Sequence, residues 1–236
     1  MRLDDPDVVR QEYATEARFL KRRAAFAHST GPSALDALFA AVAEIAPRRY
    51  LEVGSGPGDF AARVQAEIGA EVVAIDVSPR MVELARELGV DARVGDAQEL
   101  PFADGSFDCA VAAWMLYHVP DLDRALAELA RVLRPGGRLV AATNSIENMR
   151  ELWDLVGRDR RSESVRFFSE NGEEPLRRHF STVERRDIIG EMQFTYEAVR
   201  EYVENSIGHA HLAESVPAFD EPLAVTRHMT IFVATK

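Results

Sequence analysis

A short glycine-rich segment is the part of the chain best suited to hold a ligand. The stretch LEVGSGPGDF, residues 51–60, follows an apolar run and carries three glycines in five positions, Gly54, Gly56 and Gly58. Glycine lets the backbone approach a bound molecule without a Cβ atom in the way. A dinucleotide-binding turn has the spacing G-x-G-x-x-G, so that a helix N-terminus meets a pyrophosphate, whereas this turn reads G-x-G-x-G and continues with Asp59. Because Glu52 and Asp59 frame the turn with negative charge, it favours a cationic or amine-bearing ligand over a pyrophosphate.

An aspartate further along the chain has the spacing of a ribose ligand. Asp76 ends the apolar run EVVAID and lies 18 residues beyond Gly58, and an acidic residue that binds ribose hydroxyls is expected roughly 20 residues on. Hydrogen bonds from a diol to a carboxylate are charge-assisted and depend strongly on geometry. Ligands of open α/β sheets bind at the carboxyl ends of the strands, so we expect the glycine turn and Asp76 at one edge of a sheet.

The elements that position these residues alternate between two periodicities from about residue 49. Short apolar runs predict strands at 49–53, 71–76, 91–94, 107–113 and 137–143. Helical patterns lie between them: one repeats every four residues from Phe60 and stops at Gly69, one follows Ser78-Pro79, and one follows Asp121. This alternation predicts right-handed crossovers and an α/β, doubly wound, mostly parallel sheet with helices on both faces.

Beyond residue 143 the pattern changes. It predicts helices at 146–156 and about 169–179, a strand at 180–189, a helix from Thr195 to Gly208, and a closing strand at 228–236. The segments outside the regular alternation are 1–47, 144–168 and 190–222. We expect these segments to form a lid over the carboxyl edge of the sheet.

The ordered motifs resemble those of the class I methyltransferases that use S-adenosylmethionine, in particular the small-molecule, type 11-like members. E-x-G-x-G-x-G after the first strand is similar to motif I of that family, and AIDVS, GDAQELPF, FDCAVAAWMLYHVPD and LRPGG-x-L-V follow in the family's order. The resemblance spans most of the first two-thirds of the chain. It implies a Rossmann-like methyltransferase fold of seven strands, in which the last strand, 228–235, runs antiparallel beside the fifth.

The resemblance also implies S-adenosylmethionine as the cofactor and S-adenosylhomocysteine as the product. In it Asp76 matches the residue that binds the ribose hydroxyls, and Asp96 matches the residue that accepts from the adenine amino group. Tyr13, in QEYATEA, resembles an aromatic residue that closes over the cofactor in related enzymes, and packing on a helix face is the alternative. The cofactor-binding set that we predict is Tyr13, Glu52, Gly54, Gly56, Gly58, Asp76, Val77, Met81, Asp96, Ala97 and Ala113.

The segment after the fourth strand contains the candidates for chemistry at the acceptor. Histidine titrates near neutral pH, which makes His118 the candidate general base; the alternative is that it orders the loop by a hydrogen bond. The other acceptor contacts that we predict are Trp114, Met115, Tyr117, His209 and His211. Trp114 and Met115 have packing against a helix as their alternative. His209 and His211 have only Glu214 nearby as a third metal ligand, so no metal is predicted and a loop position is favoured.

The net charge and the composition limit the kinds of partner that the chain is expected to have. The 236 residues carry a net charge of −11 with a pI near 5.1, which opposes a broad phosphate-binding surface, so nucleic acid is not a predicted partner. The basic run Lys21-Arg22-Arg23 is interpreted as a solvated helix face, with contact to an acidic acceptor as the alternative.

No apolar run reaches the length that spans a bilayer, and the N-terminus lacks a secretory signal. The single cysteine, Cys109, has apolar neighbours and is predicted to be buried and inert. These features predict a cytoplasmic protein, monomer or homodimer, without membrane contact.

The predicted organisation is one methyltransferase domain, residues 1–236, with an N-terminal helical lid at 1–47, a cofactor-binding core at 48–143, and acceptor-lid helices with the last two strands at 144–236. The predicted function is in-line SN2 methyl transfer to an oxygen, nitrogen or carbon nucleophile of a small-molecule acceptor. The alternatives are an RNA or protein methyltransferase and, less favoured, a non-catalytic nucleotide-binding or NAD-dependent protein.

Overall fold

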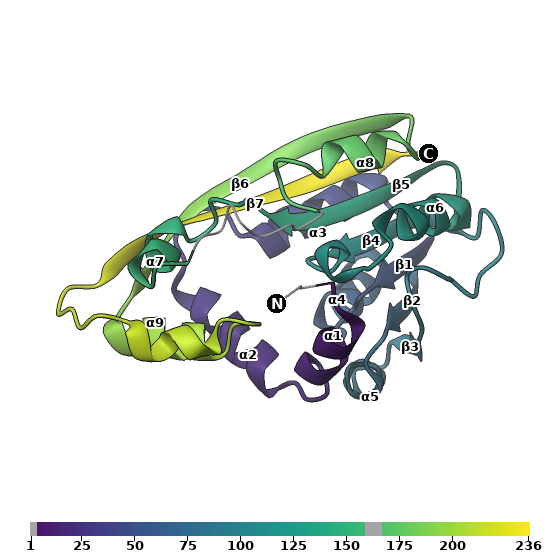
Figure 1. Cartoon of the computed structure of the whole chain (residues 1–236). Coiled ribbons are helices and arrows are strands. Elements are labelled where there is room, and N and C mark those ends of the chain that lie inside the picture. Colours follow the sequence, from purple (N-terminus) through teal and green to yellow (C-terminus); the bar gives the residue numbers. More distant parts are fainter. Residues whose placement is uncertain (1–3, 159–166) are drawn as a thin grey trace.

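The structure, a computed structural model, describes residues 4–158 and 167–236 and contains a seven-stranded sheet (Figure 1). The strands are β1 (Arg49–Val53), β2 (Glu71–Asp76), β3 (Asp91–Val94), β4 (Phe107–Ala113), β5 (Leu133–Asn144), β6 (Thr182–Phe194) and β7 (Leu223–Thr235). Their order is β3-β2-β1-β4-β5-β7-β6. The first five strands pair in parallel, and β7 runs antiparallel to both β5 and β6. The predicted doubly wound α/β fold with an antiparallel last strand beside the fifth is therefore confirmed.

Helices cover both faces of this sheet, and each face has its own apolar cluster. On one face, α3 (Ala34–Ile45), α4 (Asp59–Ile68) and α5 (Pro79–Glu87) pack over Tyr50, Val72 and Ala74. On the other face, α6 (Leu122–Val132) and α8 (Glu173–Arg177) pack over Leu51 and Val73. Because successive residues of a strand face opposite sides, both sides must be apolar, which explains the continuous apolar runs in the sequence.

The helix boundaries follow the local signals in the sequence. Ser78 accepts a hydrogen bond from the Met81 backbone N–H at 3.3 Å and is followed by Pro79 at the first position of α5. Asp121 accepts from the Arg124 N–H at the start of α6, and Gly69 in the left-handed region ends α4. Caps of this kind satisfy the backbone groups that a helix end leaves unpaired.

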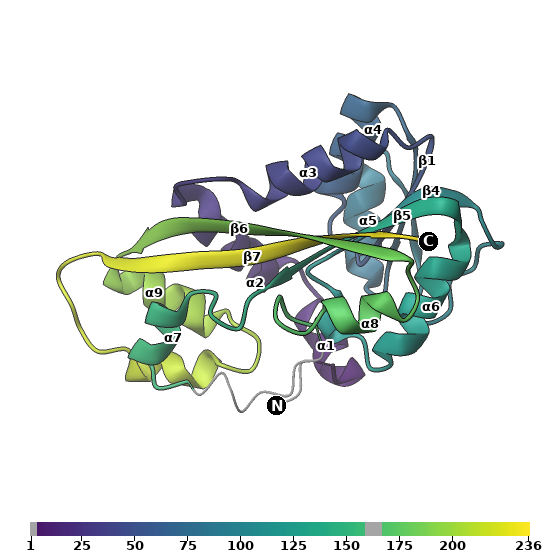
Figure 2. The ribbon, with the colours of Figure 1, turned by 90° about the horizontal axis from the view of Figure 1, so that it is seen from above.

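A third apolar cluster lies away from the sheet centre. The ribbon of β6 and β7 extends past the last residue pair of β5 with β7, Asn144 and Met229. Helices α7 (Arg150–Leu155), α9 (Tyr196–Glu204) and the short η4 (Ala210–Ser215) pack on this extension (Figures 1 and 2). We call this part the cap.

The N-terminal helices lie between the cap and the α/β core (Figure 1). They are α1 (Pro6–Glu12), α2 (Ala17–Ala24) and the short η1 (Ala25–His28). Helix α2 packs against α9 of the cap, and the Ser78 hydroxyl at the start of α5 donates to the Tyr13 carbonyl at 2.7 Å. The N-terminal segment therefore connects both halves of the molecule.

The second half of the chain differs from the prediction in extent. Strands β6 and β7 take in residues 190–194 and 223–227, which the sequence pattern did not assign to strands, and β5 begins at Leu133. Helices α7 and α8 are shorter than predicted. Helix α3 lies in a core layer and not in a lid, because Leu38, Ala41 and Val42 are buried against the sheet. The predicted lid segment 144–168 falls partly outside the described residues.

Within the described parts of the chain, no helix combines the length and the apolar character needed to cross a membrane.

Candidate active site

A cavity of about 740 Å³ lies at the carboxyl ends of the core strands, below the N-terminal helices and next to the cap. This volume is within the range of about 300–1,000 Å³ that small-molecule sites have. The cavity brings together fourteen of the residues predicted from the sequence, namely Tyr13, Glu52, Gly54, Gly56, Asp76, Val77, Met81, Asp96, Ala97, Ala113, Trp114, Met115, Tyr117 and His118.

The three glycines of the first turn have three different surroundings. All have a positive φ, which side-chain-bearing residues rarely adopt. A Cβ on Gly54 would lie 2.7 Å from the Cβ and Cγ atoms of Met115, so this glycine makes room for a protein side chain. A Cβ on Gly56 would meet only the Phe19 ring at 3.9 Å and would otherwise enter the cavity. Gly56 is therefore the glycine whose missing side chain leaves room for a ligand.

Gly58 does not line the cavity. A Cβ on it would lie 2.5 Å from the Cβ atom of Ala85. Its place is at the contact between α4 and α5, so the structure gives it a packing role instead of the ligand contact that we predicted. Asp59 also differs from expectation, because its carboxylate pairs with Arg23 at 2.7 Å.

Two buried carboxyl groups form the acidic side of the cavity. Glu52 is 3% exposed and Asp76 is 8% exposed. Burial raises the pKa of Glu52 to about 8, although a hydrogen bond from the Tyr50 hydroxyl at 3.0 Å opposes this shift. Burial likewise raises the pKa of Asp76, against backbone N–H donors from Ser78 at 2.9 Å and Gly56 at 2.8 Å. Desolvated carboxyl groups in a cavity suit a ligand that brings an ammonium group and hydroxyl donors.

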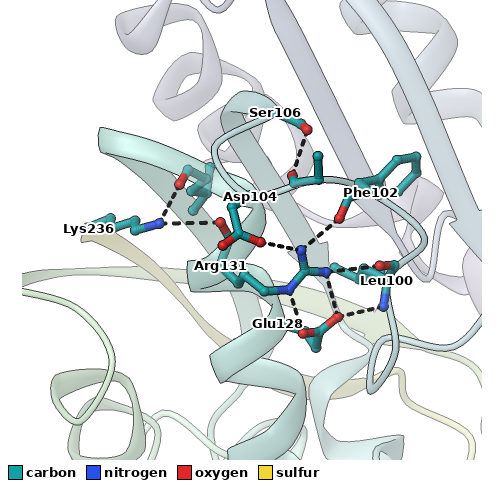
Figure 3. A network of polar contacts seen from close by, with 9 residues as sticks. Leu100, Phe102, Asp104, Ser106, Glu128, Arg131 and Lys236 are labelled. Carbon is teal, nitrogen blue, oxygen red and sulfur yellow. Dashed lines mark hydrogen bonds and ion pairs between the residues drawn. The ribbon is translucent and has the colours of Figure 1, made fainter.

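The loop that carries Asp96 is held by an arginine of α6. Arg131 donates hydrogen bonds to the carbonyls of Leu100 and Phe102 and to the carboxylates of Glu128 and Asp104, all between 2.7 and 3.0 Å (Figure 3). The five bonds use all the N–H groups of the guanidinium. The loop between β3 and β4 is therefore fixed on α6 from behind.

Asp96 itself is exposed at the edge of the cavity. Its Oδ1 accepts hydrogen bonds from the Gln98 backbone N–H at 2.8 Å and from Nε2 of Gln98 at 3.0 Å, and its Oδ2 accepts from the same Nε2 at 2.9 Å. A carboxylate has about four acceptor sites, so these bonds leave capacity for a ligand amino group. Its role in binding adenine stays a prediction.

Tyr13 and His118 meet across 105 positions of the sequence. The Tyr13 hydroxyl lies 3.2 Å from Nε2 of His118, and the two rings pack edge to face with centroids 5.7 Å apart. Burial raises the pKa of Tyr13 to about 12, so its hydroxyl keeps its proton at neutral pH. The Tyr117 ring contacts the His118 ring from another side, with centroids 4.5 Å apart. An N-terminal side chain thus helps to hold the orientation of the candidate base.

Trp114 sits in a strained turn at the end of β4. Its φ is +52°, a conformation that costs a side-chain-bearing residue about 1–2 kcal/mol. The backbone N–H donates to the Ala142 carbonyl of β5 at 2.8 Å, and the indole Nε1 is buried without a hydrogen-bond partner. Strain of this kind often accompanies functional sites.

The structure does not bring His209 and His211 to this cavity. The His209 ring packs on Trp153 of the cap, with centroids 5.3 Å apart. His211 is exposed and lines a separate pocket of about 300 Å³ beside Glu12 and Arg18. Among the residues that the structure describes, no group of three His, Cys, Asp or Glu side chains is placed to hold a metal ion.

The basic run at 21–23 is a solvated face at Lys21 and Arg23, which are exposed, but not at Arg22. Lys21 pairs with Glu201 at 3.4 Å, Arg23 pairs with Asp59 of α4, and Arg22 is largely buried and pairs with Glu12. The sequence flagged these side chains by charge, but their partners come from distant elements.

The cavity is also lined by residues that were not predicted as site residues, among them Phe19, Arg22, Asn144, Tyr202 and Arg227. Arg22 belongs to the flagged basic run, whereas the other four carry no local motif. They reach the cavity from α2, the end of β5, α9 and β7. Their position depends on how the cap and the N-terminal helices pack on the core.

Comparison with known proteins places the core in a family. Residues 51–141 match the model of a methyltransferase domain. The chain is 40% identical over 134 residues to an uncharacterized methyltransferase of Mycobacterium tuberculosis, and the match covers 54% of this chain and 53% of that protein. It is 43% identical over 104 residues to a demethylmenaquinone methyltransferase of Thermus thermophilus, covering 41% of this chain and 47% of that protein. The chain thus spans about half the length of these relatives.

A solved structure from Thermotoga maritima is similar over almost the whole chain. It is a SAM-dependent methyltransferase, a possible histamine N-methyltransferase, with a TM-score of 0.58, 25% identity, and coverage of 96% of this chain and 95% of that one. Together these matches confirm the resemblance of the core to S-adenosylmethionine-dependent methyltransferases, the family whose cofactor is S-adenosylmethionine.

Proposed function

Residues 51–141 belong to the class I S-adenosylmethionine-dependent methyltransferases, and on this premise we propose that the chain transfers a methyl group to a nucleophile on a small molecule. One observation carries the proposal. One cavity of about 740 Å³ is lined by Glu52 of β1, by Asp76 of β2, and by Tyr13 and His118. The same cavity is lined by four aromatic side chains that we call the aromatic wall: Phe19, Phe26, Trp114 and Tyr202. A cofactor and a small acceptor would meet inside it.

The residues present fit the cofactor. Asp76 would bind the ribose hydroxyls, Glu52 lies where an ammonium group would favour its charged form, and Asp96 would accept from the adenine amino group. The backbone at Gly56 leaves the open space that a methionyl chain needs. When bound, S-adenosylmethionine supplies a methyl group on a sulfonium, which is already an activated electrophile.

The protein's own residues must align the acceptor with the methyl group, exclude water from the cavity and take one proton from the acceptor. Val9 of α1, Tyr13 just after it and Phe19 of α2 line the cavity and would exclude water from it. His118 would take the proton of a hydroxyl or ammonium acceptor, with Tyr13 as its orienting partner at 3.2 Å. The aromatic wall would hold the acceptor in line with the methyl group.

The lining of the cavity favours a small, partly apolar acceptor. Phe19, Phe26, Trp114 and Tyr202 present aromatic rings to it. A relative that is named a demethylmenaquinone methyltransferase acts, by that name, on a ring-containing small molecule, and this supports an acceptor of similar character. The net charge of −11 speaks against RNA, whose binding depends on basic surface.

The test is calorimetric titration of the purified chain with S-adenosylhomocysteine, with NAD in parallel. We expect micromolar binding of the first and none of the second. Transfer of radiolabelled methyl groups from S-adenosylmethionine to a panel of hydroxylated, aminated and quinoid aromatic compounds then searches for the acceptor. Binding of NAD alone would overturn the proposal, and binding of neither would reduce the protein to a non-catalytic relative.

A further inference from the structure

The cavity contains an arginine on β7, a strand that β4 and β5 separate from β1 in the sheet. Arg227 lies on β7 opposite Gly190 of β6, two residues beyond the point where β5 ends. It is only 5% exposed and lines the cavity together with Met229. A Cβ on Gly190 would lie 2.5 Å from Nη2 of Arg227, so the glycine makes room for the guanidinium. The backbone is thus built around this side chain.

Arg227 differs from the other arginines of the cavity lining in its partners. Each of the other four has a carboxylate within ion-pair distance: Arg10 with Asp7, Arg22 with Glu12, Arg23 with Asp59 and Arg63 with Asp36. Arg227 has no carboxylate partner among the residues that the structure describes. Its Nη2 donates to the Pro32 carbonyl at 2.5 Å, and its Nε is buried without a partner.

A buried guanidinium without a carboxylate partner is energetically unfavourable. Removing a charge from water is costly unless an opposite charge compensates it. Desolvation accordingly lowers the pKa of Arg227. A ligand that brings a negative group would remove this cost, and a ligand without one would leave the N–H groups unpaired.

Two further polar atoms on the same side of the sheet lack partners, Nε1 of Trp114 and Oδ1 of Asn144. Asn144 pairs with Met229 in the sheet, and its side chain lies on the face of Ala142, where α3 packs. Arg227 and Met229 share that face because β7 alternates. Trp114 also packs on this face and binds the Ala142 carbonyl through its backbone. Unpaired donors and an acceptor therefore gather at the carboxyl end of β5.

We propose that Arg227 binds a carboxylate of the methyl acceptor, with the Trp114 indole N–H as a further donor. The planar guanidinium matches a planar carboxylate and gives a charge-assisted, directional contact. The inference rests on the proposed function for the reaction, but the binding of a carboxylate is independent of it. The acceptor is then a small aromatic or aliphatic acid, held by its acid group at β7 while its nucleophile faces the cofactor side. A neutral analogue of the same shape is rejected, because it leaves buried donors unpaired.

The experiment compares two probes that differ in one group, benzoate and benzamide. Both are titrated into the chain in the presence and absence of S-adenosylhomocysteine, with ligand-observed NMR to measure the dissociation constants. We expect benzoate to bind at least about tenfold more tightly than benzamide. Equal affinities would overturn the proposal. Tighter binding of phenyl phosphate than of benzoate would also overturn it, in favour of a phosphate ligand.

Substitutions show which residue causes the preference for benzoate over benzamide. Arg227→Gln should abolish the preference for benzoate and leave the affinity for S-adenosylhomocysteine unchanged, whereas Arg227→Lys should retain part of the preference. Arg63→Gln is the matched control, because Arg63 lines the cavity but is already paired with Asp36 at 2.7 Å; its preference should match that of the wild type. A preference that survives in Arg227→Gln would refute the assignment.

A second variant keeps the proposal open to refutation if Arg227→Gln does not fold. Trp114→Phe keeps the ring and removes the indole N–H, and should weaken benzoate binding by about threefold to tenfold without affecting benzamide. Loss of both equally would contradict a role for the N–H. The two proposals can fail separately. If the chain prefers benzoate but does not bind S-adenosylhomocysteine, the carboxylate site stands and the methyltransferase function is refuted. If the chain binds S-adenosylhomocysteine but does not prefer benzoate, the methyltransferase function stands and the carboxylate site is refuted.

Discussion

Replacing Gly56 by alanine should weaken the binding of S-adenosylhomocysteine while costing no more stability than the same change at Gly69. Both glycines have a positive φ, +54° at Gly56 and +75° at Gly69. A Cβ on Gly69 would meet nothing within 4 Å, and one on Gly56 would meet only Phe19 at 3.9 Å. Gly56, however, lines the cavity. The two substitutions therefore impose similar backbone strain and differ in what lies beside the new methyl group.

The magnitudes follow from these surroundings. An L-residue in the left-handed region costs about 1–2 kcal/mol, and the stiffer unfolded chain offsets about 0.4–1 kcal/mol of that. Both variants should thus lose about 1 kcal/mol of unfolding free energy, or about 2–4 °C in Tm for a domain of this size. A methyl group forced into occupied space costs about 1–3 kcal/mol, which corresponds to about a 5- to 150-fold loss of affinity. Only Gly56→Ala should show this second effect.

Urea unfolding measures the first effect, and calorimetric titration with S-adenosylhomocysteine measures the second. The control is Gly69→Ala, which carries the strain without a ligand beside it and should bind like the wild type. If Gly56→Ala binds as tightly as Gly69→Ala, the ligand does not lie against this turn. The turn would then be a tight corner of the fold, and the assignment of Gly56 to the cofactor site would be withdrawn.

Three other predictions test the surroundings of the same site. Gly58→Ala should lose about 1–3 kcal/mol more unfolding free energy than Gly69→Ala, because its Cβ would lie 2.5 Å from that of Ala85; an equal loss in urea unfolding would contradict this contact. Burial raises the pKa of Glu52 from 4.5 to about 8, so the folded state holds a proton that the unfolded state has released, and wild-type stability should fall between about pH 5 and 8. Glu52→Gln should lack this component, and parallel stability profiles of the two proteins would speak against a raised pKa. His118→Ala should lower turnover by about 10²- to 10⁴-fold with little change in affinity for S-adenosylhomocysteine, and Tyr13→Phe should have a smaller effect of the same kind; equal losses of turnover and affinity would make His118 a cofactor contact.

Local features of the sequence were sufficient for the core. The first four parallel strands, the helix that begins at Pro79 after Ser78, and the one that begins after Asp121 were predicted near their observed boundaries, and the fifth strand was predicted within its observed range. The reason is that caps, glycine stops and apolar periodicity act between residues a few positions apart. The cofactor side of the cavity follows from the same signals, since Gly56 and Asp76 both lie at the carboxyl ends of predicted strands.

Packing decided which of those residues face the cavity. Gly54 and Gly58 belong to one motif with Gly56, yet the first faces Met115 and the second faces Ala85. Spacing within a turn does not reveal these neighbours, because Met115 and Ala85 come from other elements. The sequence therefore identified the turn, and only the three-dimensional arrangement showed that Gly56 has open space beside it whereas Gly54 and Gly58 have packed side chains beside them.

The residues on the proposed acceptor side of the cavity could be identified almost only from the tertiary structure. Arg227 and Tyr202 have no motif around them, and they reach the cavity because β7 extends past β5 and α9 packs on that extension. The basic residues at 21–23 show the same limit, since their carboxylate partners are set by how α2 lies against α1, α4 and α9. Short-range forces specify a helix, a strand or a glycine turn from neighbouring residues. Which side chains meet in a cavity depends on contacts between elements far apart in the chain, and for this protein those contacts determine which residues line the proposed acceptor side.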